Sequence, residues 1–203
     1  MIVLGGNNMN FKTTHLFVLA SASPRRKELF SLLNVPFEIM TSDVEETSVT
    51  AQNVQQYVTE VALLKTRDVA KKCPNKTVIG ADTIVVYNDM LLHKPKSREE
   101  AINHLQTLSN DTHAVLTAVA ILAPNGQEFT FVEETKVIFK DVPQQLIEAY
   151  VDSADPFDKA GGYGIQTDGV FFVDRIEGDY NNVVGLPIAS LVENLLSLRY
   201  ISI

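Results

Sequence analysis

The segment from His113 to Phe139 restricts the fold of this chain more than any other. It reads HAVLTAVAILAPNGQEFTFVEETKVIF, which is two long runs rich in β-branched and aromatic residues on either side of Pro-Asn-Gly. Such residues favour strands, and an Asn-Gly turn between two strand-like runs is the strongest short-range signal for a β-hairpin. The segment therefore predicts two long antiparallel strands in one sheet.

The rest of the chain alternates between strand-like and helix-like segments. The stretch TVIGADTIVVYNDMLLHKP predicts a second hairpin that turns at Asn88–Asp89. Ser97 and Glu100 form a capping box that starts a helix. Hydrophobic period and turn residues predict strands over 15–21, 36–42 and 170–176, helices over about 24–33, 53–70, 143–153 and 187–198, and a loop over 155–169. This alternation predicts an α/β protein with a mixed sheet.

Length and charge limit what the chain does. A chain of 203 residues with 45% apolar residues is expected to form one domain with a substantial core. We assign that domain to residues 15–203 and interpret residues 1–14 as a short N-terminal extension that need not be ordered. The net charge of −8 argues against general binding to nucleic acids or membrane surfaces.

Composition also indicates a compartment. No apolar run reaches the roughly 20 residues that span a bilayer. The start of the chain lacks the basic and apolar regions of a secretory signal. The single cysteine, Cys73, fits a reducing environment. We therefore expect a cytoplasmic protein.

The stretch LASASPRRKEL, residues 19–29, places two arginines where a helix should repel them. Ser23 is a good N-cap and Pro24 suits the first helical position. Arg25 and Arg26 then fall in the first turn, where the free N–H groups already carry about half a positive charge. The arrangement indicates that a ligand compensates the charge.

A phosphate bound at this helix start would provide that compensation. It would accept hydrogen bonds from the helix N–H groups and from the hydroxyls of Ser21 and Ser23, and it would neutralise both guanidiniums. The prediction is an anion site, most naturally for a polyphosphate. The alternative is that one arginine is solvated or pairs with Glu28.

Lys65 is a second cation at an unusual position. It lies on the apolar stripe of the predicted helix, in register with Val54, Val58 and Val61. One interpretation is a functional lysine that faces a site. The other is a lysine whose stem is buried while its ammonium reaches water.

Asp82 lies at the centre of TVIGADTIVV, a run that is apolar on both faces. A carboxylate there should be buried or at the wall of a cleft, where burial and nearby cations act on its pKa in opposite directions. It is a candidate for a base that activates water, or for a metal ligand. The alternative is a structural Asp that accepts backbone N–H groups. Gly80, two residues earlier on the same face, is predicted to leave room for a ligand.

Other charged residues carry weaker signals. Lys94 and Lys159 are each either phosphate-steering groups or solvent-facing lysines. Glu45 and Glu46 form an acidic pair in a loop, and carboxylates together with phosphate oxygens are how Mg²⁺ is normally held. The histidines and the cysteine show no zinc-ligand spacing.

Taken in order, LASASPRRKEL, VEE, VIGADTIVV, HKP, DKAGGYGIQ and GDYNNVVGLP resemble the Maf family of nucleoside triphosphate pyrophosphatases. The resemblance runs from about Leu16 to Leu196. It implies an ITPase-like fold, in which an elongated mixed β-sheet flanked by helices forms two lobes around a central cleft. It also implies a divalent metal, Mg²⁺ or Mn²⁺, and a homodimer.

The resemblance assigns roles to particular residues. The family's base is the Asp of Gly-Ala-Asp-Thr, which is Asp82 here, and Glu46 corresponds to a glutamate that lies at the metal with it. The phosphate-contacting group of the family maps onto Ser21, Ser23, Arg25 and Arg26. Lys65 and Lys94 correspond to lysines that add positive charge.

The resemblance extends to base selectivity. The subgroup that prefers dTTP and UTP is similar to this chain at Arg25, Thr83 and Gln166. Two departures stand close to these positions in the sequence. Thr167 and Asp168 replace the glycine that usually follows the Gln, and Asn181 stands where an aromatic residue often follows Tyr.

The implied reaction is hydrolysis between the α- and β-phosphates of a nucleoside triphosphate, which gives the monophosphate and pyrophosphate. Standard or modified pyrimidine nucleotides are the implied substrates, in a role that cleans nucleotide pools or is linked to cell division. One alternative is a non-catalytic nucleotide-binding regulator of cell division. Another is a hydrolase of this fold that prefers purine nucleotides such as ITP.

Overall fold

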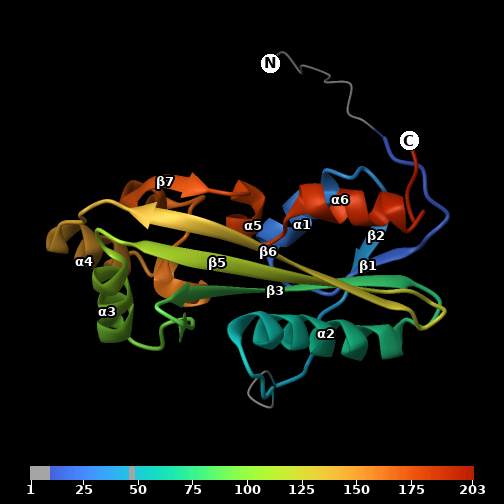
Figure 1. Cartoon of the computed structure of the whole chain (residues 1–203), viewed down its shortest axis with the longest axis horizontal. Helices are drawn as coiled ribbons and strands as arrows, with labels where there is room; N and C mark the ends of the chain where they lie inside the picture. Colours follow the sequence, from blue (N-terminus) through green and yellow to red (C-terminus); the bar gives the residue numbers. More distant parts are fainter. Residues whose placement is uncertain (1–9, 46–48) are drawn as a thin grey trace.

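The computed structural model describes residues 10–45 and 49–203. Its frame is a seven-stranded mixed sheet with the order β2-β1-β3-β5-β6-β7, in which β4 also pairs with β3 (Figure 1). The pairs β1–β2 and β1–β3 are parallel and the other pairs are antiparallel. The strands are β1 (Phe17–Leu19), β2 (Phe37–Ile39), β3 (Thr77–Tyr87), β4 (Met90–Leu92), β5 (Thr112–Leu122), β6 (Glu128–Phe139) and β7 (Val173–Glu177). The predicted α/β class with a mixed sheet is confirmed.

The two predicted hairpins form as expected. Strands β5 and β6 pair in register from Thr112 opposite Ile138 to Leu122 opposite Glu128. At their turn the Gly126 N–H donates to the carbonyl oxygen of Ala123 (3.0 Å), with Gly126 at φ +84°. The β3–β4 turn has Asn88 and Asp89 at φ +48° and +63°, the left-handed pair that a two-residue hairpin requires.

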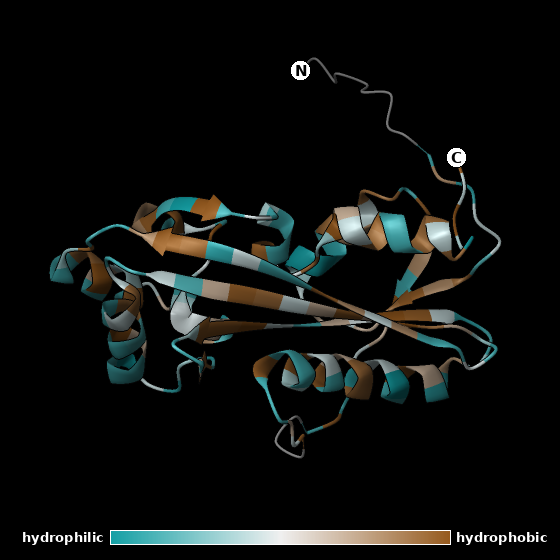
Figure 2. Ribbon diagram, in the orientation of Figure 1, coloured by the Kyte–Doolittle hydropathy of each residue, from teal (hydrophilic) through white to brown (hydrophobic). Residues whose placement is uncertain are grey.

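The helices begin where their capping residues predict. Ser23, Asn53 and Ser97 each accept a hydrogen bond from a backbone N–H three residues later and cap α1, α2 and α3. The α-helices are α1 (Pro24–Ser31), α2 (Val54–Lys72), α3 (Arg98–Leu108), α4 (Gln144–Asp152), α5 (Tyr180–Val184) and α6 (Ile188–Ser197). Figure 2 shows teal and brown bands along α2 and α6, because each helix has one apolar face on the protein and one polar face outside.

Helices cover both faces of the sheet. Helix α2 lies on one face, where Val58 and Ala62 pack against Ile84 and Leu116 (Figure 1). Helices α1 and α6 lie on the opposite face, over a core that contains Phe17, Phe30, Ile79, Ile121 and Leu191. A separate core at the other end of the long hairpin holds α3 and α4, with Leu105, Val137, Ile147, Tyr163 and Phe172. The apolar interior is therefore divided between two ends of one sheet.

Several boundaries and one helix differ from the sequence prediction. The strand predicted over 170–176 begins only at Val173, because β6 ends at its partner Phe139 and earlier residues have no strand to pair with. Residues Asp168–Phe172 form a short 3₁₀ helix, η4, in place of the predicted strand start. The predicted loop contains two more 3₁₀ helices, η2 (Asp155–Asp158) and η3 (Ala160–Gly162). The short helix α5 was not predicted.

The prediction for Gly80 is wrong. A Cβ at this position would lie 2.2 Å from the Thr66 hydroxyl oxygen of α2. The glycine therefore allows the helix to approach the strand, and the space beside it is filled by protein.

The N-terminal boundary remains a prediction. Residues 1–9 of the expected extension lie outside the described residues. Lys12 forms an isolated antiparallel bridge with Ser202, and the Thr13 hydroxyl donates to the carbonyl oxygen of Tyr200 (2.7 Å). None of the helices in the described part of the chain has the length and apolar content needed to cross a membrane.

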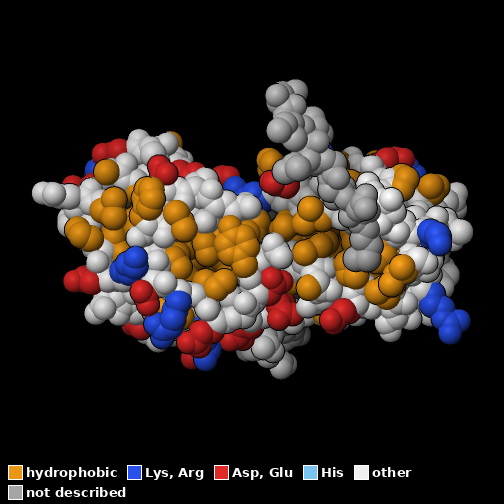
Figure 3. Space-filling model, turned by 90° about the horizontal axis from the view of Figure 1, so that it is seen from above, with side chains coloured by type: hydrophobic (Ala, Val, Ile, Leu, Met, Phe, Trp, Pro, Cys, Tyr) orange, Lys and Arg blue, Asp and Glu red, His pale blue; other side chains and the backbone are white. Residues whose placement is uncertain are grey.

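One face of the molecule carries exposed apolar side chains. Seen from the side of α6 and β7, hydrophobic groups run across the middle of the surface, and most charged groups lie near its edges (Figure 3). Large exposed apolar residues include Phe171, which precedes β7, and Tyr180, which starts α5.

Candidate active site

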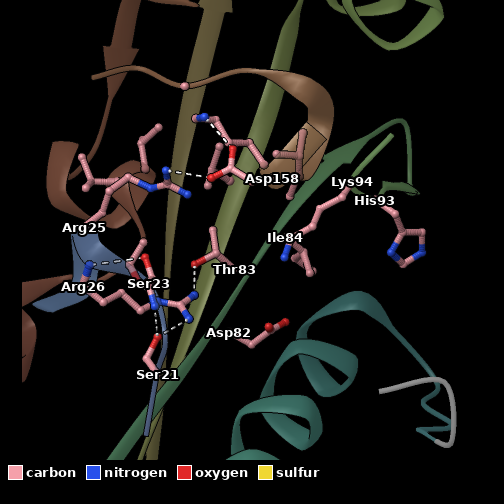
Figure 4. Close-up of a pocket in the computed structure, with 18 of the residues that line it drawn as sticks. Ser21, Ser23, Arg25, Arg26, Asp82, Thr83, Ile84, His93, Lys94 and Asp158 are labelled. Carbon is pink, nitrogen blue, oxygen red and sulfur yellow. Dashed lines mark hydrogen bonds and ion pairs between the residues drawn. The ribbon is translucent and has the colours of Figure 1, made fainter. Parts of the chain in front are cut away.

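A cavity of about 940 Å³ brings the predicted site residues together. It lies between the start of α1, the middle of β3, strand β4 and the loop over residues 155–169, here called the Gly-rich loop (Figure 4). Within the described residues, every predicted substrate-binding or catalytic side chain lines it: Ser21, Ser23, Arg25, Arg26, Lys65, Asp82, Thr83, Lys94 and Gln166. Glu46, the remaining predicted metal ligand, lies outside the described residues.

An interruption in the sheet creates this cavity. One edge of β3 pairs with β5 along its length, but the other edge pairs with β1 only as far as Ile79 and with β4 only from Val85. Residues 80–84 have no strand on that edge within the described part of the chain. Side chains from both faces of β3 therefore reach one opening, Asp82 on the face of α2 and Thr83 on the face of α1 and α5.

The turn from β1 to α1 forms one wall. Pro24 is the first residue of α1, and Ser23 caps the helix by accepting from the Arg26 N–H at 3.5 Å. The Ser23 N–H in turn donates to the Ser21 hydroxyl oxygen (3.2 Å). The first turn of α1 has no acidic residue, so its N-terminal charge and the two arginines face the cavity together.

The two arginines are used differently. The Arg26 Nε donates to the carbonyl oxygen of Gly185 (2.7 Å), and its two terminal nitrogens donate to Thr83 (2.9 Å) and Ser21 (3.4 Å). Among the described residues, the contact of the Arg25 guanidinium is at the rim, where its Nη1 lies 3.4 Å from the carboxylate of Asp158 and its side chain is 31% exposed (Figure 4). Protein groups thus anchor Arg26 firmly and Arg25 loosely.

Lys65 and Asp82 form an ion pair. The Lys65 Nζ lies 2.8 Å from the Asp82 Oδ1, and their side chains are 19% and 12% exposed. The lysine of the apolar stripe therefore ends on the carboxylate of β3. The hypothesis that backbone N–H groups hold Asp82 has no support among the described residues.

The Gly-rich loop forms the opposite wall, and ion pairs between its own residues stabilise it. Lys159 is buried and binds Asp155 (2.9 Å) and Asp158 (2.6 Å). Burial alone would raise the pKa of both aspartates, but hydrogen bonds to these groups outweigh it and leave both pKa values below the usual range. Lys159 therefore serves the loop, and Lys94 and Lys96 are lysines of the cavity wall.

One departure from the family pattern, Thr167, has a visible structural role. The Thr167 hydroxyl donates to Asp155 (2.6 Å), and the Tyr150 hydroxyl donates to the same carboxylate. Thr167 therefore closes the loop that carries Gln166. Asn181 contributes its backbone carbonyl oxygen to the end of α5, a contact that does not depend on its side chain.

Two residues of the site were missed by sequence reasoning. Asp158 contacts Arg25, and its only local signal is its place beside Lys159 in the loop. Gly185 ends α5 at φ +118° and presents its carbonyl to Arg26. An Asp N-cap at Asp179 followed by a glycine six residues later is the helix signal that would have located it.

The described side chains of the cavity supply only part of the ligand set that a divalent cation needs. The described residues contain no group of three or more His, Cys, Asp or Glu side chains able to hold a metal ion. Mg²⁺ is commonly held by one or two carboxylates together with substrate phosphates and water. Asp82 supplies one carboxylate at the cavity wall, so the residues fit a cation that arrives largely with the phosphates.

Comparison with known proteins agrees with this geometry. The family described as Maf-like protein matches residues 16–198. A protein of Geobacillus sp. named dTTP/UTP pyrophosphatase is 49% identical over 183 residues, which cover 90% of this chain and 98% of the relative. A protein of Bacillus cereus with the same name is 50% identical over 178 residues, which cover 88% of this chain and 93% of the relative.

Solved structures support the fold. A Ham1 protein from Coxiella burnetii superposes with a TM-score of 0.55 at 17% identity, covering 90% of this chain and 99% of its own. The Ham1 protein of Staphylococcus aureus gives a TM-score of 0.52 at 17% identity, covering 91% and 99%. These neighbours confirm the ITPase-like architecture, and the family match together with the sequence identities shows that the chain belongs to the Maf family.

Proposed function

We propose that this protein is a nucleoside triphosphate pyrophosphatase that hydrolyses dTTP and UTP to the monophosphate and pyrophosphate. The observation that carries the proposal is the convergence in one cavity of a carboxylate paired with a lysine and a helix start bearing two arginines. The names of the similar Geobacillus and Bacillus proteins support this choice of reaction and substrates.

The triphosphate binds along the cationic side of the cavity. The N–H groups at the start of α1, the hydroxyls of Ser21 and Ser23, and the Arg25 and Arg26 guanidiniums are donors suited to phosphate oxygens. Arg25 leaves its weak contact with Asp158 to meet the phosphates, since the pair is long and partly exposed. Lys65 and Lys94 extend the same positive lining.

Asp82 acts on the water nucleophile. Its Oδ1 is held by Lys65, which fixes the direction of the carboxylate. The carboxylate orients water and takes its proton as oxygen attacks the α-phosphorus, and the bond to the bridging oxygen breaks to release pyrophosphate. A divalent cation held by Asp82 and Glu46 would supply further neutralisation of the phosphate charge. The cations of the cavity wall stabilise charge on the leaving pyrophosphate.

Base selection belongs to the loop side of the cavity. Gln166 carries an amide that both donates and accepts, as a pyrimidine edge requires. Thr83 and Arg25 complete the set of residues that we assign to selectivity. The physiological substrate is a standard or modified pyrimidine nucleotide, in a role that cleans nucleotide pools.

A nucleotide panel with a single substitution tests the proposal. Pyrophosphate release is measured for dTTP, UTP, ITP and XTP with Mg²⁺ or Mn²⁺ and with chelator. We expect dTTP and UTP to be the best substrates and Asp82→Asn to lower kcat by about 10²- to 10⁴-fold. The matched control is Asp141→Asn, because Asp141 is an exposed aspartate outside the cavity lining.

Each contrary outcome has a definite meaning. Tight nucleotide binding without turnover by the unmodified protein would identify a regulator, such as the cell-division role, in place of an enzyme. Faster release from ITP or XTP than from dTTP and UTP would identify a purine enzyme. Near-normal turnover by Asp82→Asn would remove the base from the mechanism.

We also propose that the protein is a homodimer in the cytoplasm. The exposed apolar face described above suits a self-contact, because large apolar surfaces on soluble proteins are usually covered. Sedimentation equilibrium at micromolar concentration tests the dimer, and a monomer under those conditions contradicts it.

A further inference from the structure

Arg26 is held at two points by one short helix. Its Nε donates directly to the carbonyl oxygen of Gly185 at the end of α5. Its Nη2 donates to the Thr83 hydroxyl, and that hydroxyl lies 2.9 Å from the Thr117 hydroxyl of β5. Thr117 in turn donates to the carbonyl oxygen of Asn182 (3.0 Å), inside the same helix.

The direction of this chain of hydrogen bonds follows from its ends. A guanidinium only donates and a carbonyl oxygen only accepts, whereas each hydroxyl has one proton to donate. Thr117 gives its proton to Asn182, so it must accept from Thr83. Thr83 therefore gives its proton to Thr117 and accepts from Arg26. One polarity, from Arg26 through Thr83 and Thr117 to Asn182, satisfies all these contacts.

This polarity limits what Thr83 offers to a ligand. Its proton is committed to Thr117, so Thr83 cannot donate to a phosphate oxygen. It retains acceptor capacity that a donor group of a nucleotide base can use. Its contact with the phosphates is therefore indirect, through Arg26.

The far end of the chain is rigid. Thr117 and Asn182 are completely buried. The Asn182 side-chain amide donates to the Val115 carbonyl (2.9 Å) and to the Thr135 hydroxyl (3.0 Å), which anchors α5 to both strands of the long hairpin. The Gly185 backbone lies against the same groups, because a Cβ there would sit 3.3 Å from the Thr83 oxygen and 3.5 Å from Arg26 Nε.

We propose that Thr117 is a positioning residue that sets the Arg26 guanidinium against the substrate phosphates, although Thr117 is buried beneath Thr83 in the sheet. The inference rests on the proposed function, since it concerns the efficiency of that reaction. Removing the Thr117 hydroxyl leaves the Thr83 proton without its acceptor. The Thr83 hydroxyl then turns, and the Nη2 of Arg26 loses its fixed partner.

The test compares three variants in steady-state pyrophosphate release. Thr117→Val removes the hydroxyl at nearly constant volume and is expected to lower kcat/KM by roughly 10- to 100-fold, the usual effect of a misplaced charge-stabilising group. Thr117→Ser retains the hydroxyl and should restore most of the activity. Thr66→Val is the matched control, because Thr66 is also completely buried and its hydroxyl donates to a backbone carbonyl oxygen, that of Ala62 (2.6 Å), but it lies on α2, outside the cavity lining and the contacts of α5.

A double-mutant cycle separates positioning from loss of structure. If Thr117 acts through Arg26, Thr117→Val has little further effect in an Arg26→Ala background. A similar further loss in both backgrounds, or an equal loss in Thr66→Val and Thr117→Val, overturns the proposal. If Thr117→Val does not fold, Thr117→Ala removes the same hydroxyl without adding a second methyl branch and takes its place in the cycle. Absence of activity in the unmodified protein refutes the proposed function instead.

Discussion

Replacing His113 with Gln should remove a large part of the acid sensitivity of this fold. His113 lies on β5 with its side chain almost fully buried between the aromatic rings of Phe139 and Tyr163. Its Nε2 lies 2.7 Å from the Tyr163 hydroxyl, at the base of the loop that lines the cavity. Burial lowers its pKa to about 4 from the ordinary 6.5, against a weaker opposing influence of Asp111.

The sign and size of the effect follow from linkage. Between pH 6.5 and 4 the unfolded chain binds a proton at His113 and the folded chain does not, so stability falls as the pH falls. Above the unfolded pKa, His113 is neutral in both states and does not lower the free energy of unfolding. Once the pH reaches the folded pKa, protonation of His113 in the unfolded chain has lowered the free energy of unfolding by about 3 kcal/mol. Between pH 7 and pH 5 the loss is about 2 kcal/mol.

Urea unfolding at these two pH values measures the effect. The free energy of unfolding of the unmodified protein should fall by about 2 kcal/mol more than that of His113→Gln, because Gln does not titrate and the other groups are common to both. His104→Gln is the control for loss of a partly buried histidine whose pKa burial also lowers. Parallel losses in the unmodified protein and His113→Gln would show that protonation of His113 is not what destabilises the fold in acid.

Two further substitutions test the packing around the site. Gly80→Ala should lower the free energy of unfolding by about 1–3 kcal/mol, because the new methyl group meets the Thr66 hydroxyl. Adding Thr66→Ala should recover part of that loss in urea unfolding. Equal stability of Gly80→Ala and the unmodified protein would contradict the close approach of α2 to β3. Lys159→Met should cost roughly 1–3 kcal/mol and speed proteolysis within the Gly-rich loop, because it removes the buried cation that Asp155 and Asp158 share. An unchanged cleavage rate would mean that other contacts hold the loop.

Local chemistry accounts for the elements that were predicted correctly. Asn-Gly and Asn-Asp turns between β-branched runs produce hairpins, and the N-caps Ser23, Asn53 and Ser97 start helices, because each of these signals acts over three or four residues. The start of β7 at Val173 was not predicted, because it depends on where β6 ends. Helix α5 was missed although its Asp179 N-cap and its terminal Gly185 are local signals.

The site residues also divide into features that local sequence predicts and features that depend on distant contacts. Its residue types were identified from local anomalies: cations in the first turn of a helix, a lysine on an apolar stripe and a carboxylate inside an apolar strand. Their partnerships were not visible, since Arg26 finds Gly185 at a separation of 159 residues and Lys65 meets Asp82 from another element. No local pattern encodes such contacts, which arise when packing brings distant segments together.

From its residues alone, the chain specifies its hairpins, its helix starts and the kinds of side chain that a phosphate site needs. The interrupted edge of β3, which lets Asp82 and Thr83 reach one cavity from opposite faces of the sheet, exists only after β1, β4 and β5 have paired. The physical reason is range: turn and cap energies are set by neighbours in the sequence, whereas the burial and hydrogen bonding of Arg26, Lys65 and Thr117 are set by groups that folding brings beside them.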